Sequence, residues 1–498
     1  MIRRFEGVCE AIYKTVFLRL LRRPIIPLAI GSAIWPCQPS WAGFTQKDFV
    51  ISAAWDAARE GDSVRYLARL KKYREAHFNL VFNQVPADVD PWTPRENALK
   101  LEQVAKVPGL KMLVWDSRIV DTITACCDSA KAGDHLHHDY DGALPLRLRD
   151  RIFGYYIDDE PSEGKRLARD LAWQDFLMRA QELKPGYINL LPFAPGHFAG
   201  SKRTFEAYTA YIRGVQTHPS TRITGFDYYP FVSGSRWDNG FGWNTFDERP
   251  GTQTRYFRNL EAFADGIDSG QAFWAYPLTT PHANYLQPEK GGAAAIRFMA
   301  HAPLLYGAKG LVYFTYAPPY VLDAAGMRIR MPGYPNDGIV DLAYRPTWRY
   351  GVVAGINAAL ERLGPILMPL RREATIHASS VDPWSREAGL PTLAGGGGAG
   401  GLTSIDAGDP GLGWYAAGIF RNPEDAKTYL LLFNKDRAAS HRLKGLGIAG
   451  KGTAERFLRK DGTWKALAPR RAAASDETDF RLDLDLSGSE LELVRFSR

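Results

Sequence analysis

The sequence predicts an α/β protein, a (β/α)₈ TIM barrel followed by a C-terminal antiparallel β-sandwich. From Asp48 to about Leu370, eight short apolar runs alternate with amphipathic stretches of helical periodicity. After Pro369 the helical pattern stops and only strand-like runs remain. The first apolar run ends in Ala53-Ala54-Trp55-Asp56 instead of a Gly-rich phosphate turn, which disfavours the rival fold, a doubly wound open sheet.

The eight apolar runs are near-continuous, as expected for parallel strands that are buried on both faces. They cover residues 49–54, 78–82, 111–115, 152–157, 188–193, 223–229, 272–276 and 311–316. Helices are expected at residues 63–76, 94–107, 163–183, 205–217, 252–265, 289–306 and 346–363. The unit between Trp115 and Ile152 has no clear long helix and carries the adjacent Cys126 and Cys127 in a polar loop.

The C-terminal part has the pattern of a β-sandwich. Strands are expected at residues 414–420, 428–434, 454–459 and 480–486, with Asp461-Gly462 and Ser487-Gly488 as hairpin turns. The Gly-rich run at 395–401 is expected to be a flexible loop or linker. The predicted domains are therefore the barrel at 43–370 and the sandwich at 371–498.

Residues 1–42 have the three parts of a secretory signal peptide. Basic residues, from Arg3 to Arg23, precede a short apolar stretch, and Ser40-Trp41-Ala42 offers a small-x-small cleavage site. The sequence thus predicts an exported protein, periplasmic or extracellular, although the long basic lead-in leaves a retained membrane anchor open. No later segment has the length and apolarity of a transmembrane helix, so no stable membrane span is expected in the mature chain.

Charge and composition exclude several classes of protein. Residues 1–42 hold six basic and two acidic residues, so their removal lowers the net charge from +7 to +3 and leaves no basic block that would favour nucleic acid. With 13 Trp, 23 Tyr and 25 Phe, the chain is not mainly disordered. Cys126 and Cys127 could form a vicinal disulfide or remain two thiols.

Function in such a barrel is expected where the strands end, because the catalytic loops follow the carboxyl ends of the strands. Carboxylates and aromatic rings gather at these positions, a combination that suits sugars, since rings pack on the C–H faces of pyranoses while acids bind hydroxyls. The predicted substrate-binding residues are Trp55, Asp56, Trp115, Asp116, Tyr229, Trp274 and Tyr316. Each Trp could equally be a core residue.

The sharpest motif is the run from Gly154 to Pro161, which ends the fourth expected strand in Asp-Glu-Pro. It resembles the acid/base position of the TIM-barrel glycoside hydrolases, many of which have Asn-Glu-Pro there. This resemblance implies a glycoside hydrolase with Glu160 as general acid. The seventh expected strand departs from the family pattern, because it carries no carboxylate where retaining enzymes have a nucleophilic Glu. The next acid, Glu289, is expected to begin a helix.

Glycoside cleavage usually needs a second carboxylate, and three schemes are open. In the first, Glu160 protonates the leaving oxygen and Asp227 activates water, with carboxyl groups about 6.5–9.5 Å apart as in inverting enzymes. In the second, Asp116 or Asp56 is the partner. In the third, Asp159 and Glu160 act with an acetamido group of the substrate. The structural alternatives are an ion pair for Glu160 and a turn cap for Asp227.

Other motifs favour no cofactor. His135, His137, His138 and Asp139 are more simply a solvated loop than a metal site, and no nucleophile elbow, Walker loop or His-Glu-x-x-His motif is present in the sequence. Trp237, Phe241 and Trp243 could line a long polysaccharide groove. The sequence thus predicts an exported hydrolase of oligo- or polysaccharides with no metal or cofactor. A non-catalytic carbohydrate-binding barrel and an envelope-glycan transglycosylase are the alternatives, and the oligomeric state is not predicted.

Overall fold

The computed structural model describes residues 44–496 with internal gaps. The residues outside it are 1–43, 55–62, 84–92, 117–145, 162–163, 181–183, 191, 193–204, 232–253, 268–269, 283–291, 324–327, 379–401, 407–414, 426, 437–439, 450–452, 468–469, 472–478 and 497–498. The expected signal peptide, the Cys126-Cys127 pair, the His135–Asp139 cluster, the aromatic loop at 237–243, Glu289 and the Gly-rich run at 395–401 all lie outside the described residues.

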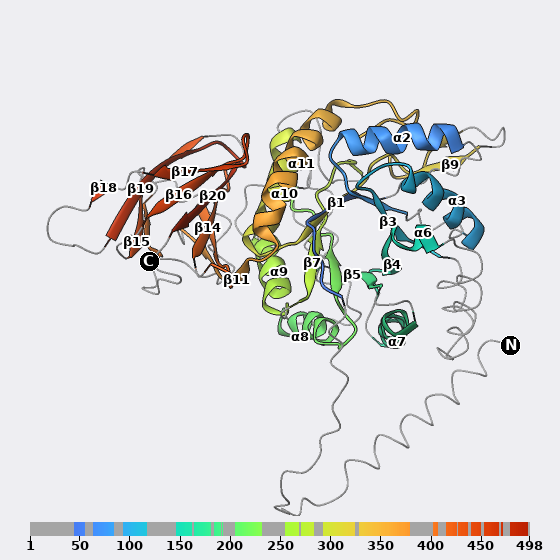
Figure 1. Ribbon diagram of the computed structural model, residues 1–498, viewed down its shortest axis with the longest axis horizontal. Coiled ribbons are helices and arrows are strands. Elements are labelled where there is room, and N and C mark those ends of the chain that lie inside the picture. The colour runs from blue at the N-terminus through green and yellow to red at the C-terminus, as the bar shows by residue number, and fades with distance from the viewer. Residues whose placement is uncertain are drawn as a thin grey trace, which may run out of the picture. The chain divides into compact units, whose positions relative to one another are not determined.

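Eight parallel strands form a closed barrel in sequence order, which confirms the predicted fold class (Figure 1). The strands are β1 (Val50–Ala53), β2 (Leu80–Phe82), β3 (Lys111–Val114), β4 (Ile152–Asp159), β5 (Gly186–Leu190), β6 (Ile223–Phe226), β7 (Ala272–Ala275) and β8 (Gly310–Tyr313). β1 pairs with β8 over four residues and closes the barrel. Burial of these strands on both faces explains why their sequences are continuous apolar runs rather than alternating ones.

Helices follow the strands and cover the outside of the barrel (Figure 1). They are α2 (Ser63–Glu75), α3 (Pro94–Ala105), α6 (Leu146–Arg149), α7 (Lys165–Ala180), α8 (Phe205–Gln216), α9 (Thr254–Asp265), α10 (Gly292–Leu305) and α11 (Trp348–Leu367). Local chemistry fixes some of their ends. Thr93 and Glu96 form a capping box at the start of α3, and Gly307, with φ +87°, lies in the left-handed region just after α10.

Aromatic side chains fill the barrel interior. Tyr187 stacks on Trp274 with ring centroids 4.8 Å apart, and the Tyr187 hydroxyl donates to the Tyr276 hydroxyl at 3.0 Å. At the N-terminal ends of the strands, the Trp274 indole donates to Gln46 Oε1, and Gln46 Nε2 donates to the carbonyl of Lys309. The filled interior leaves the carboxyl ends of the strands as the place for a site.

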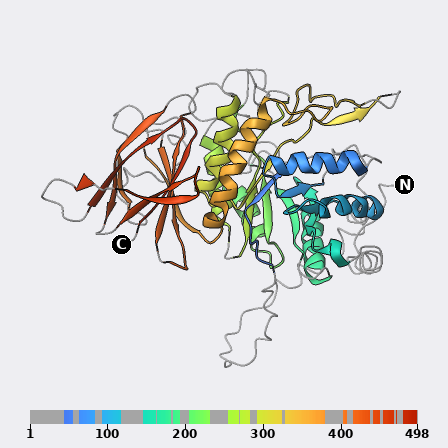
Figure 2. The same cartoon turned by 45° about the horizontal axis from the view of Figure 1, so that its top comes forward.

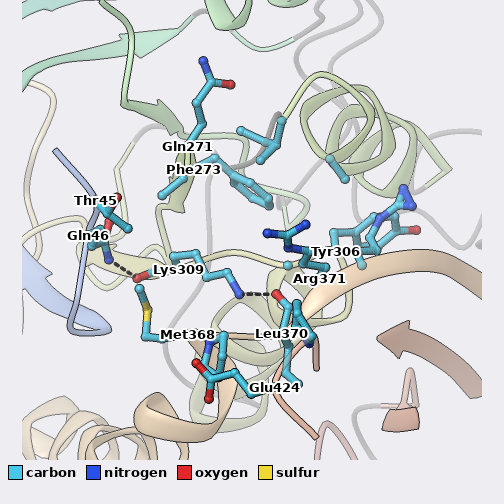
Figure 3. A pocket seen from close by; sticks show the side chains of 18 residues that line it. Thr45, Gln46, Gln271, Phe273, Tyr306, Lys309, Met368, Leu370, Arg371 and Glu424 are labelled. Atoms are coloured by element: carbon cyan, nitrogen blue, oxygen red, sulfur yellow. Dashed lines mark hydrogen bonds between the residues drawn. The ribbon is translucent and has the colours of Figure 1, made fainter. Parts of the chain in front are cut away.

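A cavity of about 590 Å³ lies at the N-terminal side of the barrel, and Figure 3 shows the side chains around it. The buried Lys309 amino group donates to the carbonyl oxygens of Leu367 and Leu370, at 2.5 and 2.9 Å. Burial lowers the pKa of Lys309 to about 7. These bonds tie β8 to the chain that leaves α11, so the lysine has a structural role on the face opposite the strand carboxyl ends.

One hairpin was not expected from the sequence. Strands β9 (Tyr320–Leu322) and β10 (Arg328–Arg330) pair antiparallel between β8 and α11. Arg328 lies over the ring of Tyr320, 4.8 Å from its centroid. The hairpin is too short to produce a readable alternation of apolar residues.

The C-terminal part contains two antiparallel sheets, as predicted (Figure 2). The six-stranded sheet has the order β11 (Arg371–His377), β13 (Tyr415–Arg421), β14 (Thr428–Asn434), β20 (Leu491–Phe496), β16 (Ala454–Leu458) and β17 (Thr463–Leu467). The four-stranded sheet has the order β12 (Leu402–Asp406), β15 (His441–Ala449), β19 (Asp479–Leu486) and β18 (Arg470–Arg471).

The two expected hairpins have different outcomes. Asp461-Gly462 joins the paired strands β16 and β17, and Gly462 has φ +69°, so this prediction is confirmed. Ser487-Gly488 is not a hairpin turn, because β19 and β20 belong to different sheets. The short polar turn looks the same in sequence whether the chain folds back or crosses to the other sheet. Of the described helices, none is long and apolar enough to span a membrane.

Candidate active site

Polar groups from consecutive strands meet at the carboxyl ends of the barrel strands. β4 supplies Asp159 and the adjoining Glu160, β5 supplies Asn189, and Asp227 follows β6. These three carboxyl groups, Asp159, Glu160 and Asp227, are called the carboxyl cluster below. Their side chains interact electrostatically with one another, so the structure brings the three predicted catalytic residues into one site.

The end of β4 sets the position of Glu160. β4 runs to Asp159, two residues beyond the expected end, and Glu160 then adopts φ +48° in the left-handed region. The Glu160 N–H donates to the carbonyl of Asn189 at 2.9 Å. Arg166, in the first turn of α7, donates to both carboxylate oxygens of Asp158 and, at 2.8 Å, to the carbonyl of Asp159. The arginine thereby braces the turn that carries Glu160.

Burial and like charge both favour the protonated forms of the cluster. Burial, then the charges of Asp227 and Asp159, raise the pKa of Glu160 well above its usual range. Burial, then the charge of Asp159, raise the pKa of Asp227 to about 7, and hydrogen bonds from Asn189 and Glu160 act in the opposite direction. Because Asp227 raises the pKa of Glu160 while Glu160 lowers that of Asp227, a proton is favoured on Glu160.

Two buried oxygen atoms in this site have no hydrogen-bond partner among the residues that the structure describes. They are Oδ1 of Asp227 and Oδ1 of Asn189. Asn189 Nδ2 is satisfied, since it donates to Asp159 at 2.9 Å. Buried polar atoms are rarely left without a partner in a folded protein, so these two are acceptors available to hydroxyl groups of a ligand.

The first of the three schemes depends on the spacing of Glu160 and Asp227. Inverting glycosidases keep their two carboxyl groups about 6.5–9.5 Å apart to hold a water molecule, and retaining enzymes about 5–5.5 Å apart. The charge of Asp227 raises the pKa of Glu160, so the two groups lie close enough to interact. The spacing that the first scheme expects stays a prediction.

Four rings lie beside the carboxyl cluster. The centroid of the Tyr229 ring is 6.1 Å from that of His282 and 5.8 Å from that of Phe314, and Tyr334 is 4.9 Å from His282. Burial, followed by the charges of Asp227 and Glu160, raises the pKa of Tyr229, which places this tyrosine next to the cluster. His282 Nδ1 lies 3.0 Å from the carbonyl of Thr280, so Nδ1 carries the hydrogen. Of the predicted substrate-binding residues, Tyr229 is thus at the site.

Trp115 is connected to the carboxyl cluster through one ring, that of Tyr156. Trp115 is 9% exposed and packs edge-to-face on Tyr156, with centroids 6.2 Å apart. Burial, followed by the charges of Asp159 and Asp158, raises the pKa of Tyr156. Asp116 is fully buried. The other predicted pair, Trp55 and Asp56, lies outside the described residues.

Two predicted substrate-binding residues are wrong. Trp274 is fully buried inside the barrel, stacked on Tyr187 and bonded to Gln46 at the N-terminal side, because its position in the middle of β7 is below the mouth. Tyr316 is 2% exposed and packs edge-to-face on Tyr73 of α2, with centroids 4.9 Å apart. Its ring therefore belongs to the layer between barrel and helices.

Asn189, His282 and Tyr334 were missed. Asn189 is a polar residue inside an otherwise apolar strand, and this signal could have identified it. His282 and Tyr334 follow their strands by several residues in loops whose course the sequence does not reveal. Among the described residues, no group of three His, Cys, Asp or Glu side chains is arranged to hold a metal ion.

The fold and site define a (β/α)₈ barrel with an acidic mouth lined by aromatic rings. No protein-family profile and no curated protein matches the chain. Among solved structures, the chain is similar to a protein titled glycoside hydrolase, with 11% identity over 90% of this chain and 92% of that chain and a TM-score of 0.49.

Two further solved structures have similarly low identity. A glycoside hydrolase family 5 protein from Bacteroides vulgatus ATCC 8482 has 11% identity, a TM-score of 0.47, and coverage of 90% of this chain and 89% of that chain. A monomeric beta-xylosidase from Caulobacter crescentus CB15 has 9% identity, a TM-score of 0.39, and coverage of 91% and 97%. Likeness at this distance assigns no activity, which has to be argued from the residues of the site.

Proposed function

We propose that this protein is a glycoside hydrolase that cleaves oligo- or polysaccharides by carboxyl acid–base catalysis. The observation that carries the proposal is the pair of interacting carboxyl groups of Glu160 and Asp227 at the barrel mouth, in which the pKa of each group is raised. A carboxyl group that keeps its proton near neutral pH can donate it to a glycosidic oxygen.

The two carboxyl groups have different roles in this proposal. Glu160 holds the proton and acts as general acid, because burial and the charges of Asp227 and Asp159 disfavour its ionised form. Asp227 is the ionised partner that assists the attack on the anomeric carbon. Asp159 keeps the local charge negative, which stabilises the positive charge that develops on the sugar ring in the transition state.

The remaining groups of the mouth suit a sugar. The unpartnered oxygens of Asp227 and Asn189 can accept hydrogen bonds from hydroxyl groups. The rings of Tyr229, Phe314 and Tyr334 offer apolar faces for the C–H bonds of a pyranose. Sugar binding therefore needs no metal in this proposal.

The test is hydrolysis of a panel of polysaccharides by the purified protein, followed as released reducing ends. We expect Glu160→Gln to lower the rate about 100-fold or more, the usual size of general acid catalysis. A loss smaller than a few-fold would show that Glu160 is not the acid. The matched control is Glu75→Gln, which removes an exposed carboxylate paired with Lys72 and should leave the rate unchanged.

Aryl glycosides give a second readout. A dinitrophenolate leaves without protonation, whereas a sugar hydroxyl does not. We therefore expect Glu160→Gln to slow the hydrolysis of dinitrophenyl glycosides much less than that of the polysaccharide. An equal loss on both substrates would indicate that the substitution disturbs binding rather than proton transfer.

A carbohydrate-binding protein without turnover is the second candidate. Residues 271–282, which form β7 and the segment after it, contain no carboxylate. Saturable sugar binding that is unchanged in Glu160→Gln, with no released reducing ends in the wild type, would favour this candidate. Larger products in addition to smaller ones would instead indicate transglycosylation.

We also propose that the protein is exported, on the basis of the basic, apolar and small-residue segments within residues 1–42. N-terminal sequencing of the protein from cell fractions tests this. A mature N-terminus at Gly43 in an exported fraction is expected, and an intact Met1 in the cytoplasm would contradict the proposal.

A further inference from the structure

A second cavity, of about 800 Å³, lies on the same side of the barrel as the carboxyl cluster. Residues 292–294 of α10, residues 335–337, residues 347–349 at the start of α11, and Arg297, which is paired with Glu490, line it. Both helices follow a strand, so their N-terminal ends lie at the carboxyl side of the barrel. Asn336 donates to the carbonyl of Pro281, the neighbour of His282, which links this rim cavity to the candidate active site.

Arg349 is the unusual residue of the rim cavity. It is 4% exposed, and its Nε has no hydrogen-bond partner among the residues that the structure describes. Asp337 is the acid that acts on its charge, but this carboxylate is already bonded to Arg330 at 2.5 Å. A buried cation without a bonded anion lowers the stability of a folded protein, so packing alone does not explain this arginine.

The position of Arg349 in its helix is also unfavourable. It lies in the first turn of α11, where the helix dipole is positive and favours acidic residues. The first turn of α10 presents a second positive helix end to the same cavity. Two helix N-termini and one unpaired guanidinium make a site that attracts an anion.

Trp348 adds an apolar surface beside the guanidinium. The indole is 45% exposed, and the Arg349 Cζ lies 4.7 Å from the centre of its ring. The indole packs closely on Gly292, where a Cβ atom would be only 2.8 Å from the ring. An exposed, well-supported indole is the kind of surface on which the C–H face of a sugar ring packs.

We propose that the rim cavity is a subsite for a negatively charged sugar residue, a uronic acid. Its carboxylate pairs with Arg349 and its ring packs on Trp348. This inference rests on the proposed function and deepens it, because it makes the substrate an acidic oligo- or polysaccharide. The planar guanidinium matches a carboxylate, which can accept two parallel hydrogen bonds from it.

The test measures binding rather than hydrolysis, by isothermal titration calorimetry on the full chain carrying Glu160→Gln. The probes are a trisaccharide with one uronic acid residue, its neutral counterpart with a hydroxymethyl group in place of the carboxylate, and a counterpart with a sulfate ester. We expect the uronic acid probe to bind at least 10-fold more tightly than the neutral probe. We expect added salt to weaken its binding.

The variants separate the two parts of the subsite. Arg349→Met keeps an unbranched apolar side chain without the guanidinium and should reduce binding of the uronic acid probe at least 10-fold without changing that of the neutral probe. Trp348→Ala should weaken both. The matched control is Arg345→Met, which removes a nearby arginine that is 79% exposed and paired with Asp341. It should change neither.

Thermal melting tests the alternative that Arg349 stabilises the fold instead of binding a ligand. Because Arg349 is buried without a bonded anion, Arg349→Met should melt at or above the temperature of the parent protein. A lower melting temperature that Arg349→Lys restores would overturn the proposal, as would equal binding of acidic and neutral probes or tighter binding of the sulfate ester. If the wild type hydrolyses no polysaccharide while Arg349 still selects the uronic acid probe, the hydrolase proposal fails and the subsite stands.

Discussion

Replacing Asp227 by Asn should stabilise the protein at neutral pH while removing activity. Burial and the charge of Asp159 raise the pKa of Asp227 to about 7, from 3.8 in the absence of these effects. Between these values the folded protein binds a proton that the unfolded chain has lost, so stability falls as pH rises through this window. Above pH 7 the free-energy cost of keeping Asp227 ionised in a buried site is fully present, and below pH 4 it is absent. An uncharged Asn does not incur it.

The size of the effect follows from the pKa. A difference of about three units at 1.36 kcal/mol each gives an upper value of about 4 kcal/mol for the gain at pH 8. For a chain of this length, the entropy of unfolding converts 4 kcal/mol into a rise of roughly 4 °C in melting temperature. Asp227 and Glu160 titrate as a pair, so loss of the Asp227 charge also makes ionisation of Glu160 less unfavourable, and the gain in stability includes this effect.

The assay is thermal unfolding of wild type and Asp227→Asn at pH 4 and pH 8. The difference in melting temperature should be close to zero at pH 4 and positive at pH 8. Asp150→Asn, which changes an exposed aspartate away from the site, should show no such pH dependence. A lower melting temperature of Asp227→Asn at pH 8, or the same difference at both pH values, would refute the electrostatic reasoning.

Two further predictions concern residues that position the site or support the barrel. Arg166→Met should reduce kcat about 10-fold, because Arg166 braces the turn that carries Glu160, yet it should change stability by less than about 1 kcal/mol, because its ion pair with Asp158 is half-exposed. Steady-state kinetics and thermal melting test this against the control Arg74→Met, which breaks the exposed pair with Glu361. An equal loss of kcat in both variants would contradict the role of Arg166. Burial lowers the pKa of Lys309 to about 7. Between pH 7 and 10.5 the unfolded chain therefore keeps a proton on Lys309 that the folded protein has lost, and stability rises with pH. The stability of wild type relative to Lys309→Met, measured by denaturant unfolding, should increase by about 3 kcal/mol from pH 6 to pH 9, and a pH-independent difference would show that Lys309 does not titrate in this way.

The barrel could be predicted from the sequence because its determinants are local. Each strand is an apolar run, and each helix has a 3.6-residue period, so order and class follow without knowledge of distant contacts. The same runs hide which way a side chain points. In a strand that is buried on both faces, inward and outward residues are equally apolar, so the inward Trp274 could not be distinguished from a residue of the mouth. Tyr316 follows β8 and packs on Tyr73 of α2, which the apolar run at 311–316 does not reveal either.

The carboxyl cluster was predictable in part for a related reason. Glu160 and Asp227 directly follow β4 and β6, close to the expected ends of these strands, whereas His282 and Tyr334 reach the mouth through loops. The approach of Glu160 to Asp227 depends on the tilt of strands and the left-handed turn at Glu160, which no local pattern specifies. Sequence reasoning thus predicted acids that the structure brings together, and it could not give their spacing.

The charges of the mouth and of the rim cavity together constrain the substrate. The carboxyl cluster would repel the carboxylate of a uronic acid, since like charges a few ångströms apart disfavour each other in a partly buried site. The rim cavity offers Arg349 and two helix N-termini to the same carboxylate. If both proposals hold, the acidic residue binds at the rim and a neutral sugar occupies the mouth, so the bond that is cleaved adjoins a neutral residue. A polymer that mixes neutral and acidic sugars therefore fits the two sites better than a chain of uronic acids alone.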